Sequence, residues 1–282
     1  MTDPYLDGRW VLRNLLGIAD AERLQQAEAD FTKLRLFELE QGSAVNGAFD
    51  SNHLRALHRS LFQDIYAWAG LTRGDEIELG GRRIVSPALL IKGQTKFETS
   101  PRVNASLERV LESVAERGLR GLSVAEFSRR SADLLTDLNR VHPFREGNGR
   151  TQRVFLSLLA RDAGHPLVWD VVSQERMIAA ITRCSRGERA PMRRLIAEIT
   201  NTARSNALRD AIWFLEREEI NWNERYLATA ETGQAYEGVI AAGGSRHSMV
   251  FSSDEKIIVA LTEDLGDAQA GGVSFTAHGS IG

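Results

Sequence analysis

The chain has 282 residues, a net charge of −3 and a hydrophobic content of 43%, which is enough to bury a sizeable core and leave room for a second, smaller domain. Its one cysteine, Cys184, excludes an intrachain disulfide, and no Cys/His cluster has the spacing of a zinc site. Neither a secretory signal nor an apolar run of about eighteen residues is found, so we expect no membrane span.

A hairpin is the first element that the sequence predicts clearly. In the segment 75–87, DEIELGGRRIVSP, two short β-favouring runs flank Gly80 and Gly81. Paired glycines between such runs are typical of a tight hairpin turn.

A helix is predicted from Ser123 to Val141. Ser123 and Glu126 form an S-x-x-E start typical of a capping box, and apolar residues recur at helical spacing after it. His142 then lies where the helix meets a loop. An imidazole with a pKa near neutrality can take the proton from an incoming hydroxyl, so His142 is a candidate general base.

The stretch 142–153, HPFREGNGRTQR, is the most informative part of the chain. Gly147 and Gly149 flank Asn148, and residues without a Cβ let backbone N–H groups approach a phosphate closely. Glu146, directly before this cradle, suits Mg²⁺, which one or two carboxylates usually hold together with the phosphates of a substrate. The sequence therefore predicts a site for Mg²⁺ and a nucleoside triphosphate.

A second helix is predicted from Arg150 to Ala163, ending at Gly164. Its positive dipole end would face the bound anion. Arg150 and Arg153 lie three residues apart, on one face of the first turn, where two charged forks can reach a polyphosphate. Each of these features alone is more often structural, but their succession is hard to explain by packing.

The residue pattern of the sequence changes after about residue 205. A helical pattern through Leu208, Ile212 and Leu215 gives way to short apolar runs separated by Gly-, Ser- and Asp-rich turns. These runs predict a small antiparallel β-barrel, similar to an OB fold. We therefore expect two domains, a catalytic one over 1–205 and, over 206–282, a linker helix with a small β domain.

The motif resembles the Fic family signature H-x-F-x-[DE]-G-N-G-R-x-x-R, and every fixed position is filled. The segments DPYLDGRWVLRNLLGI near the N-terminus and LHRSLFQDIYAWAG at 57–70 also look like that family, so the resemblance covers roughly 3–205. It implies a mainly α fold, a Fic helical bundle with a β-hairpin flap. The added barrel resembles the architecture of Fic effectors exported by type IV secretion systems.

The resemblance also implies an activity, the transfer of AMP from ATP to a Ser, Thr or Tyr hydroxyl of a target protein. A lysine in place of Gly149 marks the relatives that act as kinases, and it is absent here. In the family the hairpin is the flap that docks the target, with Ile84 and Val85 as candidates for its strand edge, although a small surface hairpin with two buried side chains is about equally expected. The implied roles are His142 as base, Glu146 as Mg²⁺ ligand, Gly147, Asn148 and Gly149 as anion hole, Arg150 as phosphate ligand and Arg153 as γ-phosphate clamp.

The chain lacks the inhibitory string [ST]-x-x-x-E-[GN] with which many family members block the second motif arginine. The nearest approach is Glu237-Gly238, where Gly233 stands in place of Ser or Thr and the surroundings favour a strand. Either a small antitoxin-like protein supplies the inhibitory glutamate, or delivery and target access control the enzyme. Family analogy offers two targets, a type II topoisomerase subunit in the bacterial cytoplasm or a small GTPase in a host cell reached by type IV secretion.

Two other interpretations remain open from the sequence. The chain could be an effector scaffold that binds nucleotide without transferring it, or a nucleic-acid-associated OB protein. Charge argues against the second, because 216–282 carries eleven acidic and four basic residues, a net charge of about −7, whereas a groove that follows a phosphate backbone should be basic.

Overall fold

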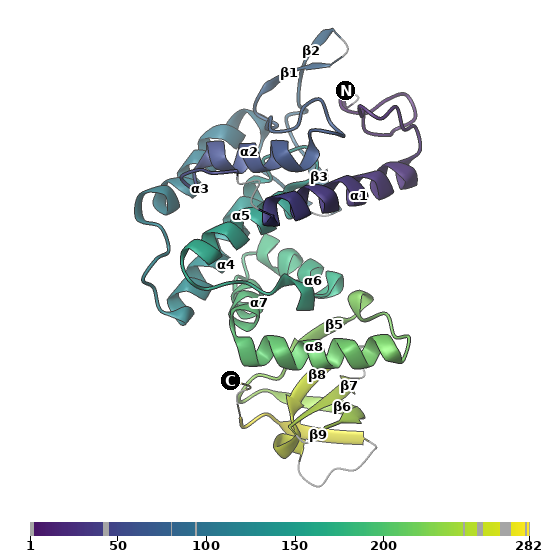
Figure 1. Cartoon of the computed structure of the whole chain (residues 1–282), viewed down its shortest axis with the longest axis vertical. Coiled ribbons are helices and arrows are strands. Elements are labelled where there is room, and N and C mark those ends of the chain that lie inside the picture. Colours follow the sequence, from purple (N-terminus) through teal and green to yellow (C-terminus); the bar gives the residue numbers. More distant parts are fainter. Residues whose placement is uncertain are drawn as a thin grey trace. The chain divides into compact units, whose positions relative to one another are not determined.

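The structure is a computed structural model whose described part contains eight α-helices and nine strands (Figure 1). The chain folds into two compact units, Met1–Leu122 with Asp133–Gly164, and Ser123–Ala132 with His165–Gly282. The predicted fold class, mainly α with a small C-terminal β part, is confirmed. The structure describes residues 3–41, 45–79, 81–93, 95–244, 246–252, 256–265, 272–279 and 281.

Five of the described helices lie wholly or partly in the first unit. Asp20 and Asp50 begin the first two of them, because each aspartate accepts a backbone N–H three residues later and so satisfies a donor of the first turn. The helices are α1 (Ala21–Glu40), α2 (Ser51–Phe62), α3 (Val103–Arg117), the second half of α4 (Val124–Val141) and α5 (Asn148–Asp162).

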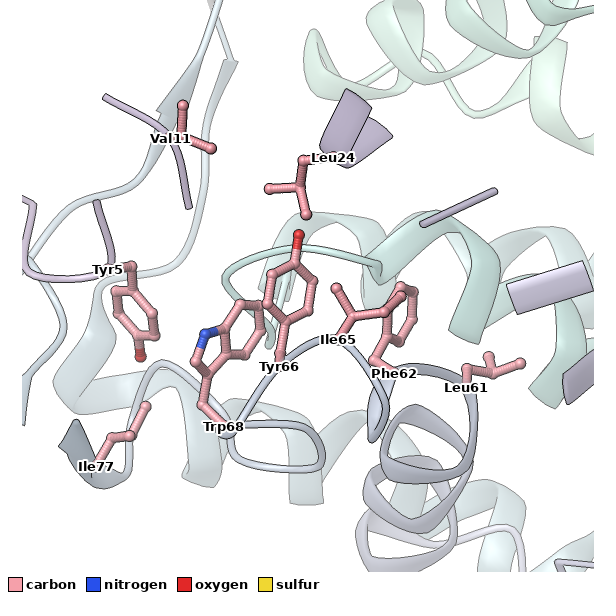
Figure 2. Close-up of a cluster of buried hydrophobic side chains, with 9 residues drawn as sticks. All are labelled: Tyr5, Val11, Leu24, Leu61, Phe62, Ile65, Tyr66, Trp68 and Ile77. Atoms are coloured by element: carbon pink, nitrogen blue, oxygen red, sulfur yellow. The ribbon is translucent and has the colours of Figure 1, made fainter. Parts of the chain in front are cut away.

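An aromatic-rich cluster of buried residues lies around the end of α2 and the loop that follows it (Figure 2). Trp68 stacks on Tyr66 with ring centroids 4.3 Å apart, and Tyr5 meets Trp68 edge-on at 5.3 Å. The hydroxyl of Tyr66 points toward Leu24 of α1. The cluster consists of Tyr5, Val11, Leu24, Leu61, Phe62, Ile65, Tyr66, Trp68 and Ile77.

The predicted hairpin is present as β1 (Glu76–Leu79) paired antiparallel with β2 (Arg82–Val85). Gly81 has a φ of 72°, as a tight turn requires, while Gly80 lies outside the described residues. Ile84 packs against the aromatic cluster, and Val85 is 63% exposed. One of the two candidate edge residues is therefore a packing residue. A second hairpin, which we did not predict, joins β3 (Ile91–Lys92) and β4 (Thr95–Lys96).

The second unit combines helices with a five-stranded sheet in the order β5-β8-β7-β6-β9. Strand β5 runs parallel to β8, so the sheet is mixed rather than purely antiparallel as predicted, and its described pairings form an open sheet. The elements are α6 (Gln174–Ser185), α7 (Ala190–Thr200), α8 (Thr202–Arg217), β5 (Tyr226–Thr229), β6 (Ala235–Gly243), β7 (His247–Ser252), β8 (Lys256–Leu261) and β9 (Gly272–Thr276).

Strands were predicted from the apolar runs GVIAA, SMVF, KIIVAL and GVSF, which correspond to β6, β7, β8 and β9, whereas β5 had no such signal. Glu237 and Gly238 lie in β6, as expected from their strand-like surroundings. Helix α8 runs through residues 205 and 206 without a break, and the division of the chain at that point stays a prediction. Among the described helices, none has the length and apolar character needed to cross a bilayer.

Candidate active site

The motif 142–153 lies where α4 ends and α5 begins, as predicted. Ser123 accepts the backbone N–H of Glu126 and so caps α4, but the reciprocal half of the capping box does not form. The carboxylate of Glu126 instead binds Arg129 and Arg130 on the next turn. Helix α5 begins at Asn148, two residues earlier than predicted, and Gly164 follows its end with a φ of 80°.

His142 directly follows α4 and has a φ of 49°, in the left-handed region. Its backbone N–H still donates to the carbonyl of Leu138, so the chain leaves the helix at this residue. The imidazole is buried and stacks on the ring of Phe97, with centroids 3.8 Å apart and planes 21° from parallel. No side chain of the described residues is hydrogen bonded to either ring nitrogen.

Burial, as the largest effect, and the nearby cations Lys92 and Arg73 together lower the pKa of His142 to about 3, against the opposing effects of Glu146 and the Asn139 backbone. The ring is therefore neutral at physiological pH. A neutral imidazole can accept a proton, so His142 is in the protonation state that general base catalysis requires.

The anion cradle depends on one glycine conformation. Gly147 has a φ of 81°, and a Cβ there would overlap the ring of Phe62. Gly149 is in the first turn of α5 with an ordinary helical conformation, so the turn needs only one of the two glycines for its backbone shape. The hydrogen-bond ladder of α5 begins with Thr151 N–H donating to the carbonyl of Gly147. Earlier N–H groups of the helix thus have no carbonyl one turn before them and can meet an anion.

Asn148 shapes the loop through its side chain. Its amide donates to the carbonyl of Phe144 at 2.7 Å and its oxygen accepts the backbone N–H of Phe144 at 2.9 Å. The side chain is buried and both of its ends are used. The backbone N–H of Asn148, at the start of α5, can meet an anion.

His58 of α2 supports the same loop. Its Nδ1 accepts the N–H of Gly70 at 2.8 Å, so the proton is on Nε2, which donates to the carbonyl of Glu146 at 3.0 Å. The ring stacks on Phe144 with centroids 3.8 Å apart. Burial lowers the pKa of His58 to about 3, so this histidine too is neutral. These bonds give His58 a structural role in the loop.

Glu146 is held between two donors. Its Oε1 accepts the backbone N–H of Gly147 at 3.0 Å, and its Oε2 lies 3.1 Å from Nζ of Lys92 in β3. Burial raises the pKa of the carboxyl, but Lys92 and the Gly147 hydrogen bond outweigh burial, and the pKa is lowered overall. The carboxylate is thus charged and ready to bind a cation.

The two motif arginines differ in their partners. Arg150 donates to the buried Glu28 of α1 at 3.0 Å, and its guanidinium lies 4.8 Å over the ring of Phe62. Tyr66 also donates to Glu28. The guanidinium of Arg153, in contrast, has no carboxylate partner among the described residues, and burial together with the charge of Arg150 lowers its pKa. Arg153 is therefore the more available of the two for phosphate.

Among the residues that contact the motif, sequence reasoning missed Glu28, Arg73, Lys92 and Phe97. Each is far from the motif in the chain and belongs to a common residue type without a local pattern. Only the hairpin β3–β4, which carries Lys92 and precedes Phe97, could have given a signal, through the glycine of its turn, Gly93.

A model of the Fic/DOC family matches residues 48–160, which include the motif. The chain is also 34% identical over 204 residues to the "Probable protein adenylyltransferase Fic" of Salmonella typhimurium. The match spans 72% of this chain and 94% of that protein. The chain belongs to the Fic/DOC family.

Other Fic relatives are longer than this chain. It is 40% identical over 180 residues to the "Protein adenylyltransferase VbhT" of Bartonella schoenbuchensis, a match that spans 63% of this chain and 35% of that protein. A "Protein adenylyltransferase" of Bartonella henselae is 30% identical over 237 residues, a match that spans 83% of this chain and 43% of that protein. The chain thus spans less than half the length of these two relatives.

Solved structures of bacterial effector proteins share the fold. The "Type IV secretion system effector protein BepA" matches 98% of this chain and 96% of its own with a TM-score of 0.89 and 26% identity. The BepC protein of Bartonella tribocorum, solved with bound AMPPNP, matches 69% of this chain and 95% of its own with a TM-score of 0.65 and 28% identity. The BepA match includes the residues of the C-terminal sheet, because it covers nearly the whole chain.

Proposed function

We propose that this Fic protein transfers AMP from ATP to a Ser, Thr or Tyr hydroxyl of a target protein. The observation that carries the proposal is His142, a buried and neutral imidazole in the same short loop as an anion cradle and a charged carboxylate. Its relatives are named protein adenylyltransferases, which supports the same reaction. Nucleotide binding is supported by the AMPPNP in the BepC structure.

In the proposed step the target hydroxyl attacks the α-phosphorus of ATP. The new bond joins the hydroxyl oxygen to the α-phosphorus, the bond between that phosphorus and the β-phosphate oxygen breaks, and pyrophosphate leaves. A ring nitrogen of His142 takes the hydroxyl proton. The ring is neutral at pH 7, because burial together with Lys92 and Arg73 lowers its pKa to about 3, and a neutral imidazole has a lone pair that can accept the proton. The free N–H groups at the start of α5 bind the phosphate charge, as helix N-termini do.

The residues present fit a magnesium ion bound together with ATP. The structure offers one charged carboxylate, that of Glu146, and no group of three His, Cys, Asp or Glu side chains in the described residues could form a cage made by the protein alone. Mg²⁺ is often held by so few protein ligands, because the phosphates of the substrate supply the rest. A bound Mg²⁺ would neutralise phosphate charge, with Glu146 as its ligand and Lys92 released from Glu146.

Arg153 is the proposed γ-phosphate clamp, since its guanidinium has no carboxylate partner among the described residues and its side chain is only half-buried. Arg150 would reach phosphate as a second ligand only while sharing its guanidinium with Glu28. We expect Arg153→Ala to raise the KM for ATP more than Arg150→Ala, which would mainly loosen α1. Steady-state kinetics of the two variants, with circular dichroism as a folding control, test this order.

The proposed flap docks the target through the main chain of β2, at Ile84 and Val85. The exposure of Val85 favours docking at this edge. The hairpin β3–β4 is a second candidate for docking the target, because Lys92 contacts Glu146 and Ile91 is half exposed. Proline substitution removes a backbone donor without adding charge. If β2 docks the target, Val85→Pro weakens target labelling and Ile91→Pro does not, whereas the opposite result would move the flap to β3–β4.

For the target protein and the place where the enzyme acts, we propose two alternatives. The likeness to BepA favours an exported effector that acts on a host small GTPase, and the lack of an inhibitory string favours a cytoplasmic toxin that acts on a type II topoisomerase subunit under a separate antitoxin-like inhibitor. The inhibitor would supply a glutamate to Arg153, which is free of such a partner among the described residues.

Labelling with ATP carrying ³²P on either the α- or the γ-phosphate tests the proposal. Wild type and His142→Ala are incubated with Mg²⁺ in bacterial and mammalian lysates. Label from the α-position that is lost in His142→Ala would establish AMP transfer, and removal of a general base costs about 10²- to 10⁴-fold in rate. Label from the γ-position would mean a kinase, and no label from folded, ATP-binding protein would favour the scaffold interpretation.

A further inference from the structure

Arg73 lies in the loop between α2 and β1, and its side chain is only 1% exposed. Its guanidinium is surrounded by oxygen acceptors. Nε donates to the carbonyl of His142 at 2.9 Å, and Nη2 donates to the carbonyls of Val141 at 3.0 Å and Glu98 at 2.9 Å. Nη1 donates to the hydroxyl of Ser100 at 3.2 Å.

The backbone of Arg73 adds another bond to the same loop. Its N–H donates to the carbonyl of Pro143 at 2.7 Å. One residue therefore binds the carbonyls of 141, 142 and 143 in succession. The last carbonyls of a helix have no partner within the helix and carry the negative end of its dipole, so a buried cation there stabilises the end of α4.

The loop needs such support because His142 has a φ of 49°. For a residue with a Cβ, the left-handed conformation is unfavourable and persists only where the surroundings fix it. This conformation sets the direction in which the imidazole leaves the backbone, and with it the stacking on Phe97. Arg73 binds the carbonyl of Val141 before this strained residue and the carbonyl of Pro143 after it.

The cation at Arg73 persists in this buried place. Burial lowers the pKa of Arg73 to about 10, and the nearby Tyr5 and Glu98 oppose that effect. The guanidinium is thus charged at neutral pH. No carboxylate is ion-paired with it among the described residues, so its donors remain directed at the carbonyls.

We infer that Arg73 is a positioning residue for the AMP transfer, which fixes the backbone of His142 in the conformation that presents its ring as a base. The inference rests on the proposed function and assigns Arg73 no contact with ATP or with the target. Loss of Arg73 should therefore lower kcat without weakening nucleotide binding.

Three variants of the full chain test this role. Arg73→Met keeps the bulk but removes every side-chain donor, Arg73→Lys keeps a charge near the carbonyls, and Ser100→Ala removes one partner of Arg73 while leaving the bonds to 141 and 142. The backbone bond to Pro143 is kept in all three. We expect Arg73→Met to lose about 100-fold in kcat per folded molecule, since small errors of placement have such effects. Arg73→Lys should recover about tenfold of this, Ser100→Ala should stay within threefold of wild type, and the KM for ATP should change less than twofold in all three.

A kcat of Arg73→Met within threefold of wild type would overturn the inference, and so would a higher KM for ATP with kcat unchanged. If Arg73→Met does not fold, the comparison uses Arg73→Lys and Ser100→Ala, and equal kcat values for these two would also overturn it. Thermal unfolding and the amount of ADP bound at saturation give the folded fraction of each variant.

A spectroscopic readout separates this inference from the proposed function. In protein with ¹³C-labelled histidine, the ring of His142 should show an upfield shift from stacking on Phe97, and His142→Ala assigns the signal. Folded Arg73→Met or Arg73→Lys should lose part of that shift, whereas Ser100→Ala should keep it. If wild type transfers no AMP, the function fails while this readout still decides the positioning role, and an unchanged shift in both Arg73 variants would overturn it.

Discussion

Both compact units of the molecule bury an arginine, and the two arginines have different partners. Arg73 in the first unit binds backbone carbonyls next to His142, whereas Arg176 in the second forms an ion pair with the buried Glu198 and donates to the carbonyl of Leu227. Bonds to carbonyls order a loop, while a pair with a carboxylate connects α6 to α7 and β5. The partners of a buried charge, rather than its burial, therefore indicate whether it serves chemistry or architecture.

The largest expected effect on stability is in the second unit. Arg176→Met leaves Glu198 buried without its cation, and breaking a buried ion pair costs about 3–5 kcal/mol of unfolding free energy. The kcat per folded molecule should fall far less than in Arg73→Met. Urea unfolding together with AMP transfer measures both quantities.

The double variant Arg176→Met with Glu198→Gln is the matched control for that comparison. Glutamine is neutral and its oxygen can still accept the N–H of Thr229, so we expect it to recover much of the loss. A double variant no more stable than Arg176→Met would show that packing, not charge, explains the effect. A large fall in kcat would remove the contrast between the two arginines.

A smaller effect should separate the two glycines of the motif. Gly147→Ala places a Cβ against Phe62 at a φ of 81°, and the left-handed conformation alone costs about 1–2 kcal/mol for alanine. Gly149→Ala meets no atom nearer than Nη1 of Arg153 at 3.6 Å, and alanine favours a helix over glycine by about 1 kcal/mol. Thermal unfolding should thus move in opposite directions, and equal shifts would contradict the assigned role of Gly147.

Acid should destabilise the first unit through its two buried histidines. The pKa values of His58 and His142 are lowered to about 3 by burial, while the unfolded chain protonates its histidines near 6.5. The unfolded state then binds more protons, so the unfolding free energy falls as pH decreases from about 6.5 toward 3, by about 1.4 kcal/mol per pH unit for each histidine. Urea unfolding between pH 7 and 5.5 measures this slope. His58→Gln should reduce it, and an unchanged slope would mean that other groups dominate.

Much of the site could be predicted from the sequence because it is local. The helix that ends before His142, the turn at Gly147 and the helix that follows depend on neighbouring residues, and all three are present. The apolar runs of the C-terminal part likewise predicted four strands. Strand β5 and its parallel pairing with β8 were not predicted, because they join segments about thirty residues apart and a four-residue strand has little periodicity.

The sequence by itself determined the family, the helical class and the chemical character of the motif, because these depend on residue types at fixed short spacings. Only the tertiary structure decided which groups surround them. It pairs Arg150 with Glu28 and leaves Arg153 without a carboxylate partner among the described residues, although the sequence places both arginines on the same face of one helix. It also buries His142 beside Phe97, Arg73 and Lys92, from segments far away in the chain. Desolvation and the charge of distant neighbours set the protonation state of a residue, and both arise only when the chain is folded.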